Sequence, residues 1–178
     1  MPPNVQIRHP KPDPRPDPRP GVILDETDRR LLRTLAITPR AGPVELARQL
    51  QVARNTVQAR LDKLLAQGVV AGFGPDVDLA KVGYVVAAFI TLQIAQGRGA
   101  DVTEHLASIP QVVEVQRTTG AGDLLCRVVA TSNSHLAEVL DQILEVPGID
   151  RTTTSLVLDT PLPARVLPAI DALPTASR

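Results

Sequence analysis

The sequence predicts an α+β protein made of a helical unit followed by a sheet unit. Up to about residue 68, apolar residues recur at every third or fourth position, which is typical of amphipathic helices. Beyond that point, short apolar runs of strand length alternate with helical stretches. The chain is 43% hydrophobic but only 2% aromatic, so Leu, Val, Ile and Ala must fill both cores.

The helical unit is predicted to hold three helices and a short strand. The first helix begins after Asp25, whose carboxylate can cap it, and ends near Pro39. The second helix covers 45–50, the third covers 54–67, and a strand over 69–75 follows. This order predicts a winged helix-turn-helix, a motif whose second helix enters the major groove of DNA.

The sheet unit is predicted to follow the order β-α-β-β-α-β of the ferredoxin-like fold. Strands are expected over 84–94, 112–118, 124–130 and 149–158, and helices over 100–108 and 134–144. The first of these strands is apolar at nearly every position, which predicts that both of its faces are covered.

These elements divide the chain into five segments. The predicted segments are a disordered proline-rich tail at 1–21, the helix-turn-helix domain at 22–72, a linker at 73–83, the ferredoxin-like domain at 84–159 and a C-terminal tail at 160–178, irregular or ending in a short helix. Eight of the seventeen prolines fall in residues 1–20 and disfavour helix there. That tail is either a solvated leader or a basic arm that contacts DNA phosphates.

Composition and charge narrow the class of protein. The sequence has no apolar run of 18 residues and no signal-peptide core, which predicts a cytoplasmic, nucleoid-associated protein without a membrane span. The single cysteine, Cys126, is expected to be a buried thiol rather than part of a disulfide or metal site. Residues 1–75 carry twelve Lys and Arg against seven Asp and Glu, whereas residues 76–178 carry seven against twelve. The basic front half therefore indicates that the protein binds a polyanion, and double-stranded DNA is the expected partner.

The exposed face of the predicted helix 54–67 carries side chains suited to DNA. Asn and Gln amides can pair with adenine, and Arg can pair with guanine or a phosphate. The candidate DNA-binding residues are Arg54, Asn55, Thr56, Gln58, Arg60 and Lys63, of which the last two are expected to contact phosphates. The alternative is that this face is only a polar surface in contact with water.

The order and spacing of short motifs along residues 24–159 resemble the leucine-responsive, or Lrp/AsnC, family of transcription regulators. The motifs are Leu24 to Leu32, Glu45 to Ala47, Val57 to Leu64, Gly68 to Phe73, Leu79 to Gly83, Ile109 to Val112, Thr119 to Leu125, Val146 to Ile149 and Thr152 to Leu158. The resemblance implies homodimers that pair sheet to sheet, and that can assemble further into tetramers or octamers. It also implies a small-molecule effector, an amino acid or related metabolite, but no cofactor. One departure is Ala53, where the family usually has a helix-capping Ser.

In that family the effector binds between subunits, close to the turn that here begins at Thr119. The candidate effector-binding residues are Thr119, Gly120, Gly122, Asp123, Thr152 and Thr154. The two glycines permit positive φ and close approach of a ligand to backbone N–H groups, and Asp123 can hold an ammonium group. The alternative is a tight hairpin capped by Asp123, with the two threonines acting only as strand formers.

Two other functions remain open on the sequence alone. An architectural DNA-binding protein would use the same helix without sequence preference or effector. A tetrapyrrole-modifying enzyme shares this two-part architecture and would place paired His or Arg groups around its substrate. The three histidines, His9, His105 and His135, are scattered, and no metal or phosphate-loop pattern is present. We therefore expect no catalytic residue and no bound metal.

Overall fold

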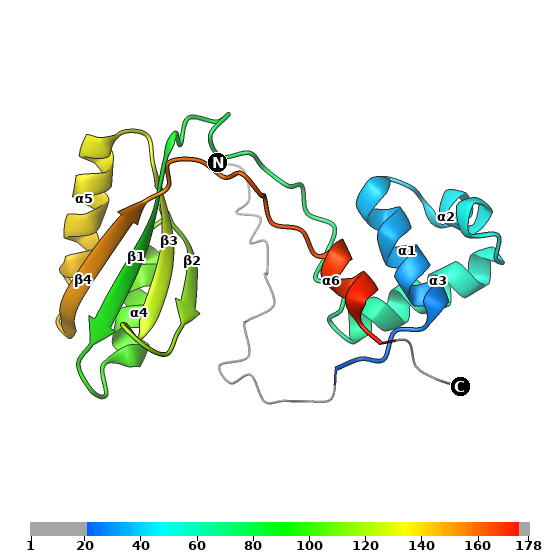
Figure 1. The fold of residues 1–178 in the computed structure, drawn as a ribbon, viewed down its shortest axis with the longest axis horizontal. Coiled ribbons are helices and arrows are strands. Elements are labelled where there is room, and N and C mark those ends of the chain that lie inside the picture. Colours follow the sequence, from blue (N-terminus) through cyan, green and yellow to red (C-terminus); the bar gives the residue numbers. More distant parts are fainter. Residues whose placement is uncertain (1–20, 175–178) are drawn as a thin grey trace, which may run out of the picture. The chain divides into compact units, whose positions relative to one another are not determined.

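The computed structural model describes residues 21–174, so the predicted N-terminal tail lies outside the described part. The chain divides into two compact units, each with its own core (Figure 1). The helical unit combines the chain up to Pro75 with the segment from Ala164 onward, and the sheet unit spans Asp76–Pro163. None of the helices between residues 21 and 174 has the length and hydropathy needed to cross a membrane.

The three predicted helices of the helical unit are confirmed. They are α1 (Glu26–Ile37), α2 (Pro43–Leu50) and α3 (Arg54–Ala66). Asp25 caps α1 as predicted, through a hydrogen bond that its side chain accepts from the Asp28 backbone N–H. Buried aliphatic side chains from all three helices form one core, and they are Leu31, Leu46, Leu50, Val57, Leu61 and Leu64. At about 1.5–3 kcal/mol for each fully buried large side chain, this core holds the helices together.

The prediction of a strand over 69–75 is wrong, because the residues there adopt no strand. The backbone N–H groups of Val69 and Val70 instead donate to the carbonyl of Leu64, at 2.9 and 3.2 Å. Gly68, with φ at +69°, reverses the chain into this arrangement. These two donors complete the end of α3 and cannot pair with a neighbouring strand, so the helix-turn-helix has no wing at this position.

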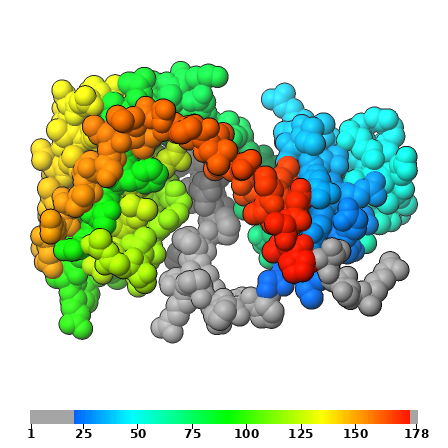
Figure 2. Space-filling view, viewed as in Figure 1, coloured from blue at the N-terminus to red at the C-terminus, as the bar shows by residue number. Residues whose placement is uncertain are grey.

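The chain beyond residue 160, predicted as an irregular tail or a short helix, contributes a fourth helix to the helical unit. Helix α6 (Leu167–Ala172) lies against α1 (Figure 2). The contact joins segments about 140 residues apart in the sequence, since Arg33 of α1 bonds to Asp171 of α6.

The sheet unit has the predicted β-α-β-β-α-β order. Its elements are β1 (Val86–Ile94), α4 (Gly99–Ser108), β2 (Val112–Arg117), β3 (Leu124–Ala130), α5 (Asn133–Leu144) and β4 (Ile149–Leu156). The strands form one antiparallel sheet in the order β2-β3-β1-β4, and α4 and α5 pack on one of its faces. Cys126 is buried in that core as predicted, and burial raises the pKa of its thiol to about 11.

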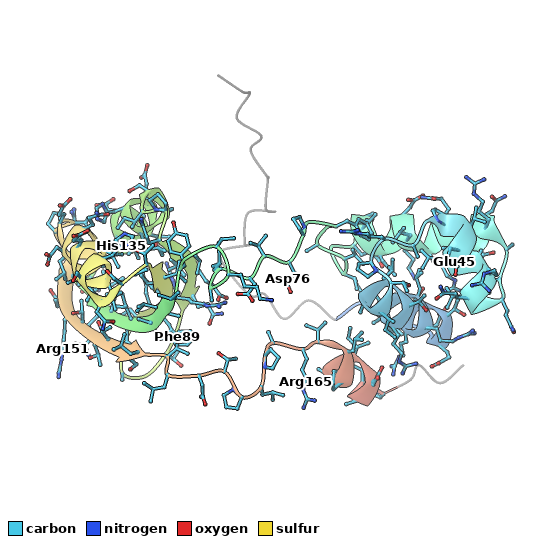
Figure 3. All side chains as sticks on the ribbon, turned by 90° about the horizontal axis from the view of Figure 1, so that it is seen from above. Glu45, Asp76, Phe89, His135, Arg151 and Arg165 are labelled. Atoms are coloured by element: carbon cyan, nitrogen blue, oxygen red, sulfur yellow. The ribbon has the colours of Figure 1, made fainter. Side chains whose placement is uncertain are left out.

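The expectation that β1 is covered on both faces is not met within one chain. Ala88, Ile90 and Leu92 are fully buried beneath the helices. Residues that alternate with them, such as Phe89 (labelled in Figure 3) and Thr91, lie on the opposite side of the sheet. The side chain of Phe89 is 41% exposed. We call this side the open face. It includes Arg127 and Leu125 of β3, which pair with Phe89 and Thr91.

Candidate nucleic-acid interface and ligand pocket

The start of α3 presents an exposed polar surface. Its cap residue Ala53 makes no side-chain hydrogen bond, as the sequence predicts, so the first N–H groups of the helix have no partner from that side chain. Arg54, Asn55 and Thr56 are all exposed, whereas Val57 is 1% exposed and belongs to the core. The helix therefore buries one stripe and offers the opposite side of its first turns to a partner.

Gln58 continues this exposed surface one turn further along α3. Its side-chain amide donates to the carboxylate of Asp62 at 2.8 Å, an i,i+4 contact on the helix surface. The bond leaves the amide oxygen of Gln58 as an acceptor and holds the side chain along the helix. Such exposed i,i+4 contacts contribute only about 0.2–0.5 kcal/mol, so a base edge can displace this one.

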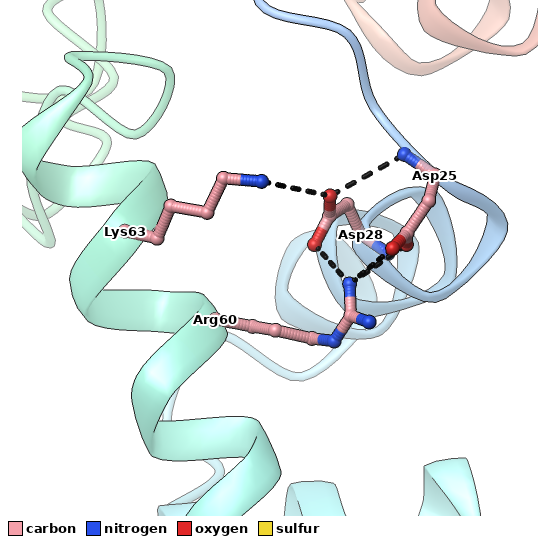
Figure 4. A network of polar contacts seen from close by, with 4 residues as sticks. All are labelled: Asp25, Asp28, Arg60 and Lys63. Atoms are coloured by element: carbon pink, nitrogen blue, oxygen red, sulfur yellow. Dashed lines mark hydrogen bonds and ion pairs between the residues drawn. The ribbon is translucent and has the colours of Figure 1, made fainter. Parts of the chain in front are cut away.

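Arg60 faces α1 instead of the exposed surface. Its guanidinium donates to Asp25 Oδ2 at 2.6 Å and to Asp28 Oδ1 at 2.7 Å (Figure 4). Lys63 Nζ lies 3.8 Å from Asp28 Oδ2. We call these four residues the α1–α3 clamp. Because Asp28 is fully buried, its carboxylate needs these partners, and the clamp fixes α3 against the start of α1.

The protonation of the clamp follows from these contacts. Burial by itself raises the pKa of Asp25, but hydrogen bonds from Arg60 and from the Asp28 backbone N–H outweigh it, so the pKa is lowered overall. Hydrogen bonds to Asp25 and Asp28 raise the pKa of Arg60. The ion pair is therefore charged at neutral pH. Lys63 is half exposed, so it keeps a surface from which it can reach a phosphate.

The arginines of the helix-turn-helix differ in how far they are already neutralised. Arg48 of α2 makes two hydrogen bonds to Glu45, and these hold the pKa of that carboxyl at about 2 together with a bond from Gln49. Among residues 21–174, no carboxylate lies within ion-pair distance of Arg54. Arg54 is thus better placed than Arg48 to bind an anion.

The turn between β2 and β3 is hydrogen-bonded to the C-terminal end of β1. The Asp123 backbone N–H donates to Leu92 O, and the Asp123 carboxylate accepts from Ile94 N, both at 2.8 Å. Gln93 donates from its side chain to Ala121 O at 2.8 Å. These bonds make the turn a rigid part of the sheet. They also give Asp123 a capping role, the alternative left open by the sequence.

The two glycines of this turn serve different purposes. Gly120 has φ at +107°, which L side chains rarely adopt. Gly122, which could also adopt a positive φ, does not do so. A Cβ there would lie 2.3 Å from Thr91 Cγ2 and 3.0 Å from Leu92 O, so Gly122 allows the turn to pack on β1 and leaves no room for a ligand at that point.

Two recesses flank the turn. The first, of about 450 Å³, is lined by Arg117, Thr118, Asp123 and residues between 94 and 100. The second, of about 230 Å³, opens on the open face and is lined by Thr91, Gln93, Ala121, Arg151 and Thr153. Each recess offers one arginine and several hydrogen-bonding groups, which suits a small polar ligand with a carboxylate. Between residues 21 and 174, no cluster of three or more His, Cys, Asp or Glu is arranged to hold a metal ion.

Both units match known protein families. Residues 24–65 match the AsnC-type helix-turn-helix domain, and residues 87–167 match the Lrp/AsnC ligand binding domain. The chain belongs to the Lrp/AsnC family of transcriptional regulators. This Lrp/AsnC regulator is 32% identical over 139 residues to the HTH-type transcriptional regulator FL11 of Pyrococcus horikoshii, covering 78% of this chain and 92% of FL11.

Solved structures agree with this assignment. Escherichia coli AsnC superposes with a TM-score of 0.77 at 28% identity, covering 82% of this chain and 99% of AsnC. A transcriptional regulator of Neisseria meningitidis in complex with L-Met gives a TM-score of 0.72 at 26% identity, with coverages of 84% and 99%. The helical unit of this Lrp/AsnC regulator is thus a DNA-binding domain, and its sheet unit is a ligand-binding domain for a small-molecule effector.

The structure brings together only part of the predicted effector site of this Lrp/AsnC regulator. Asp123 lines the first recess, whereas Thr119, Gly120 and Gly122 line neither. Thr152 and Thr154 pair with Leu92 and Ile90, so they lie on the helix-covered side of the sheet. The sequence analysis missed Arg117 and Arg151. Strict alternation along β4 would have placed Arg151 and Thr153, not their neighbours, on the open face.

Proposed function

We propose that this regulator reads a specific DNA sequence as a homodimer, through the exposed start of α3. The observation that carries the proposal is the division of α3 into two parts. Arg54, Asn55, Thr56 and Gln58 are exposed at its start, while Arg60 holds the helix to α1. In a helix-turn-helix the N-terminal residues of the second helix meet the base edges. A recognition helix needs both features, free side chains to read bases and a fixed orientation.

The roles of the individual side chains follow from their chemistry. Asn55 and Gln58 can each donate to and accept from the edge of an adenine. Arg54 and Lys63 bind phosphates or, for Arg54, a guanine. Arg60 acts through Asp25 and Asp28 as a positioning residue. This revises its predicted part as a phosphate contact.

The open face supports pairing of two copies of the sheet unit. Phe89 and Leu125 place apolar side chains there, and the helices α4 and α5 both pack on the other side of the sheet. Burying such a face against its copy generates a two-fold dimer with two recognition helices. We expect them to reach half-sites about one helical turn, or a multiple of it, apart. The dimer, or a tetramer or octamer built from it, acts in the cytoplasm, on the nucleoid DNA.

We assign the effector to the recesses beside the turn, and infer that it is an amino acid or similar zwitterion. Arg117 lies with Asp123 in the first recess, so a carboxylate and an ammonium group can be bound side by side. Asp123 Oδ2 is already bonded to β1, which leaves Oδ1 for the ligand. The L-Met complex of the Neisseria meningitidis relative supports this class of ligand. The role of the relatives as transcriptional regulators favours this function over catalysis.

Selection of binding sites from genomic fragments tests the DNA function. The purified full chain should enrich a sequence with two similar half-sites, and footprinting should show protection on one side of the helix at both. Inserting half a helical turn between the half-sites should weaken binding, since the two recognition helices then face different sides of the DNA. Uniform enrichment of unrelated fragments would instead identify an architectural DNA-binding protein.

Calorimetry with free amino acids tests the effector site. Screening the common amino acids by thermal shift identifies candidates, which are then titrated against wild type, Arg117→Ala and Asp123→Asn. The asparagine keeps an acceptor for Ile94 N but removes the charge, so it should abolish binding without loosening the turn. Asp101→Asn on α4 is the matched control and should bind normally. Binding that survives in Asp123→Asn but fails in Arg151→Ala would move the site to the second recess.

A further inference from the structure

Helix α6 begins where the match of the chain to the Lrp/AsnC ligand-binding domain ends. The match to the ligand-binding domain ends at residue 167, and that to the helix-turn-helix domain covers 24–65. The segment from 158 to 174, which we call the strap, leaves β4 and returns to α1. Its end is therefore a feature of this chain whose role neither domain assignment explains.

Two arginines of α1 hold α6 in place. Arg29 donates to Leu173 O and Pro174 O, both at 2.8 Å, and so places its positive charge at the C-terminal end of α6. Arg33 makes an ion pair with Asp171, at 2.7 Å from Nη2 and 2.8 Å from Nε. Ile170 adds an apolar contact with the core of the helical unit.

The contact between α6 and α1 is weak. A helix of six residues does not persist in water by itself, and no residue of α6 is fully buried. Arg29 is only 4% exposed, yet its partners just after α6 are neutral carbonyls, and its Nε finds no hydrogen-bond partner among the described residues. A buried cation with incomplete hydrogen bonding costs free energy that release of α6 into water would recover. Docked and released states of α6 are therefore close in free energy.

The strap connects the two units for a second time. The chain first passes from the helical unit to the sheet unit at Pro75, and it returns after Pro163. The last sheet bond before the strap joins Val157 N to Ala87 O on β1. Pro161 and Pro163 then stiffen the connection. While α6 is docked, the DNA-binding unit is tethered at two points instead of one.

We propose that the strap is a releasable second tether, whose docking on α1 restricts the spacing between the two recognition helices of a dimer. The route from strap to DNA consists of contacts already described. Arg29 and Arg33 belong to the same helix as Asp28, and Asp28 bonds to Arg60 of α3. The two-state element that such coupling requires is α6 itself. The inference about spacing rests on the proposed dimeric DNA binding, whereas the inference about docking does not.

Hydrogen exchange of the full-length protein tests the docking. In wild type, the amides of Ala169, Ile170 and Leu173 should exchange more slowly than in an unstructured peptide, but faster than the core of α1. Asp171→Arg should reduce this protection about two- to five-fold, the range expected for losing an exposed ion pair. Arg33→Asp with Asp171→Arg should restore it. Ile170→Asp should release α6 outright, and Glu138→Arg on α5 controls for net charge.

The affinity for DNA with altered half-site spacing tests the coupling. Wild type should lose affinity when half a turn is inserted, and Asp171→Arg and Ile170→Asp should lose several-fold less, because a single tether lets each DNA-binding unit turn further. The reversed pair and Glu138→Arg should behave as wild type. If wild type itself ignores spacing, the proposed dimeric function fails. The strap proposal is overturned if α6 exchanges like a free peptide in wild type, or if wild type is sensitive to spacing and the released variants are equally so.

Discussion

Arg60 is a single residue whose place on α3 was predicted correctly, while the structure gives it another contact than the predicted one. A basic residue on a recognition helix favours a phosphate contact. The structure places its guanidinium on two carboxylates of α1, one of them 35 positions away in the sequence. The Asp25 cap, in contrast, was predictable because its partner is three residues away. Local hydrogen bonds follow from sequence order, whereas the choice between a solvent-facing and an inward rotamer depends on the folded neighbour.

Replacing Arg60 with Ala should separate these two roles. Loss of the clamp leaves Asp28 buried with only Lys63 nearby, so the free energy of unfolding should fall by about 1.5–3 kcal/mol in denaturant titrations. The slope of log affinity for DNA against log salt should stay unchanged. Arg54→Ala is the matched control, since a lost phosphate contact lowers that slope by about 0.9. A flatter slope in the Arg60 variant would return Arg60 to the DNA interface.

At the scale of elements, periodicity predicted the helices and the four strands to within two or three residues in most cases. The strand at 69–75 failed because its apolar residues complete the end of α3, a tertiary outcome that a short apolar run does not reveal. Thr152 and Thr154, the predicted effector residues of β4, lie on the helix-covered side of the sheet, because the alternation along β4 could not be counted from a known partner strand. Thr153, between the two predicted threonines, lies opposite Thr91 on the open face.

The clamp between α1 and α3 should give the helical unit a characteristic acid sensitivity. The pKa of Asp25 is below its usual 3.8 in the folded state, so the unfolded chain binds the proton more readily. The clamp therefore stabilises fully above about pH 4, and the contribution is lost as the pH falls through the folded pKa. Circular dichroism of denaturation between pH 6 and 2 should show a steeper loss in wild type than in Asp25→Asn. An equal loss of stability in both proteins would show that the contact with Arg60 does not stabilise the charged form of Asp25.

The turn at 118–123 should depend on the missing side chain of Gly122. In Gly122→Ala the added methyl meets Thr91 and the Leu92 carbonyl, and overpacking of this kind costs about 1–3 kcal/mol. Gly122→Ala combined with Thr91→Ser removes the nearer obstacle and should recover part of the loss. The free energy of unfolding from urea titrations provides the measurement. A stable single variant would mean that the turn does not pack on β1 as described.

For the whole molecule, the sequence predicted the order of the two units. It did not predict which further segments pack against each unit. The helical unit draws its fourth helix from the far end of the chain, through Arg29 and Arg33. The open face of the sheet, with Phe89 half exposed, is completed in our proposal by a second copy. Both features depend on contacts between surfaces distant in sequence, or in different chains, which composition and periodicity do not encode. In our proposal, the exposed start of α3 reads the DNA sequence for the whole assembly.

Affinity measurements on two DNAs test this role of α3. Fluorescence anisotropy is used to titrate wild type, Asn55→Ala and Gln58→Ala against the selected site and against a shuffled duplex of equal length. Each substitution should weaken binding to the selected site by about 1–3 kcal/mol, roughly five- to 150-fold, and should change binding to the shuffled duplex much less. Gln67→Ala, the same change at the exposed end of α3, should have no effect on either. Equal losses on both duplexes, or no loss on the selected site, would contradict sequence reading by α3.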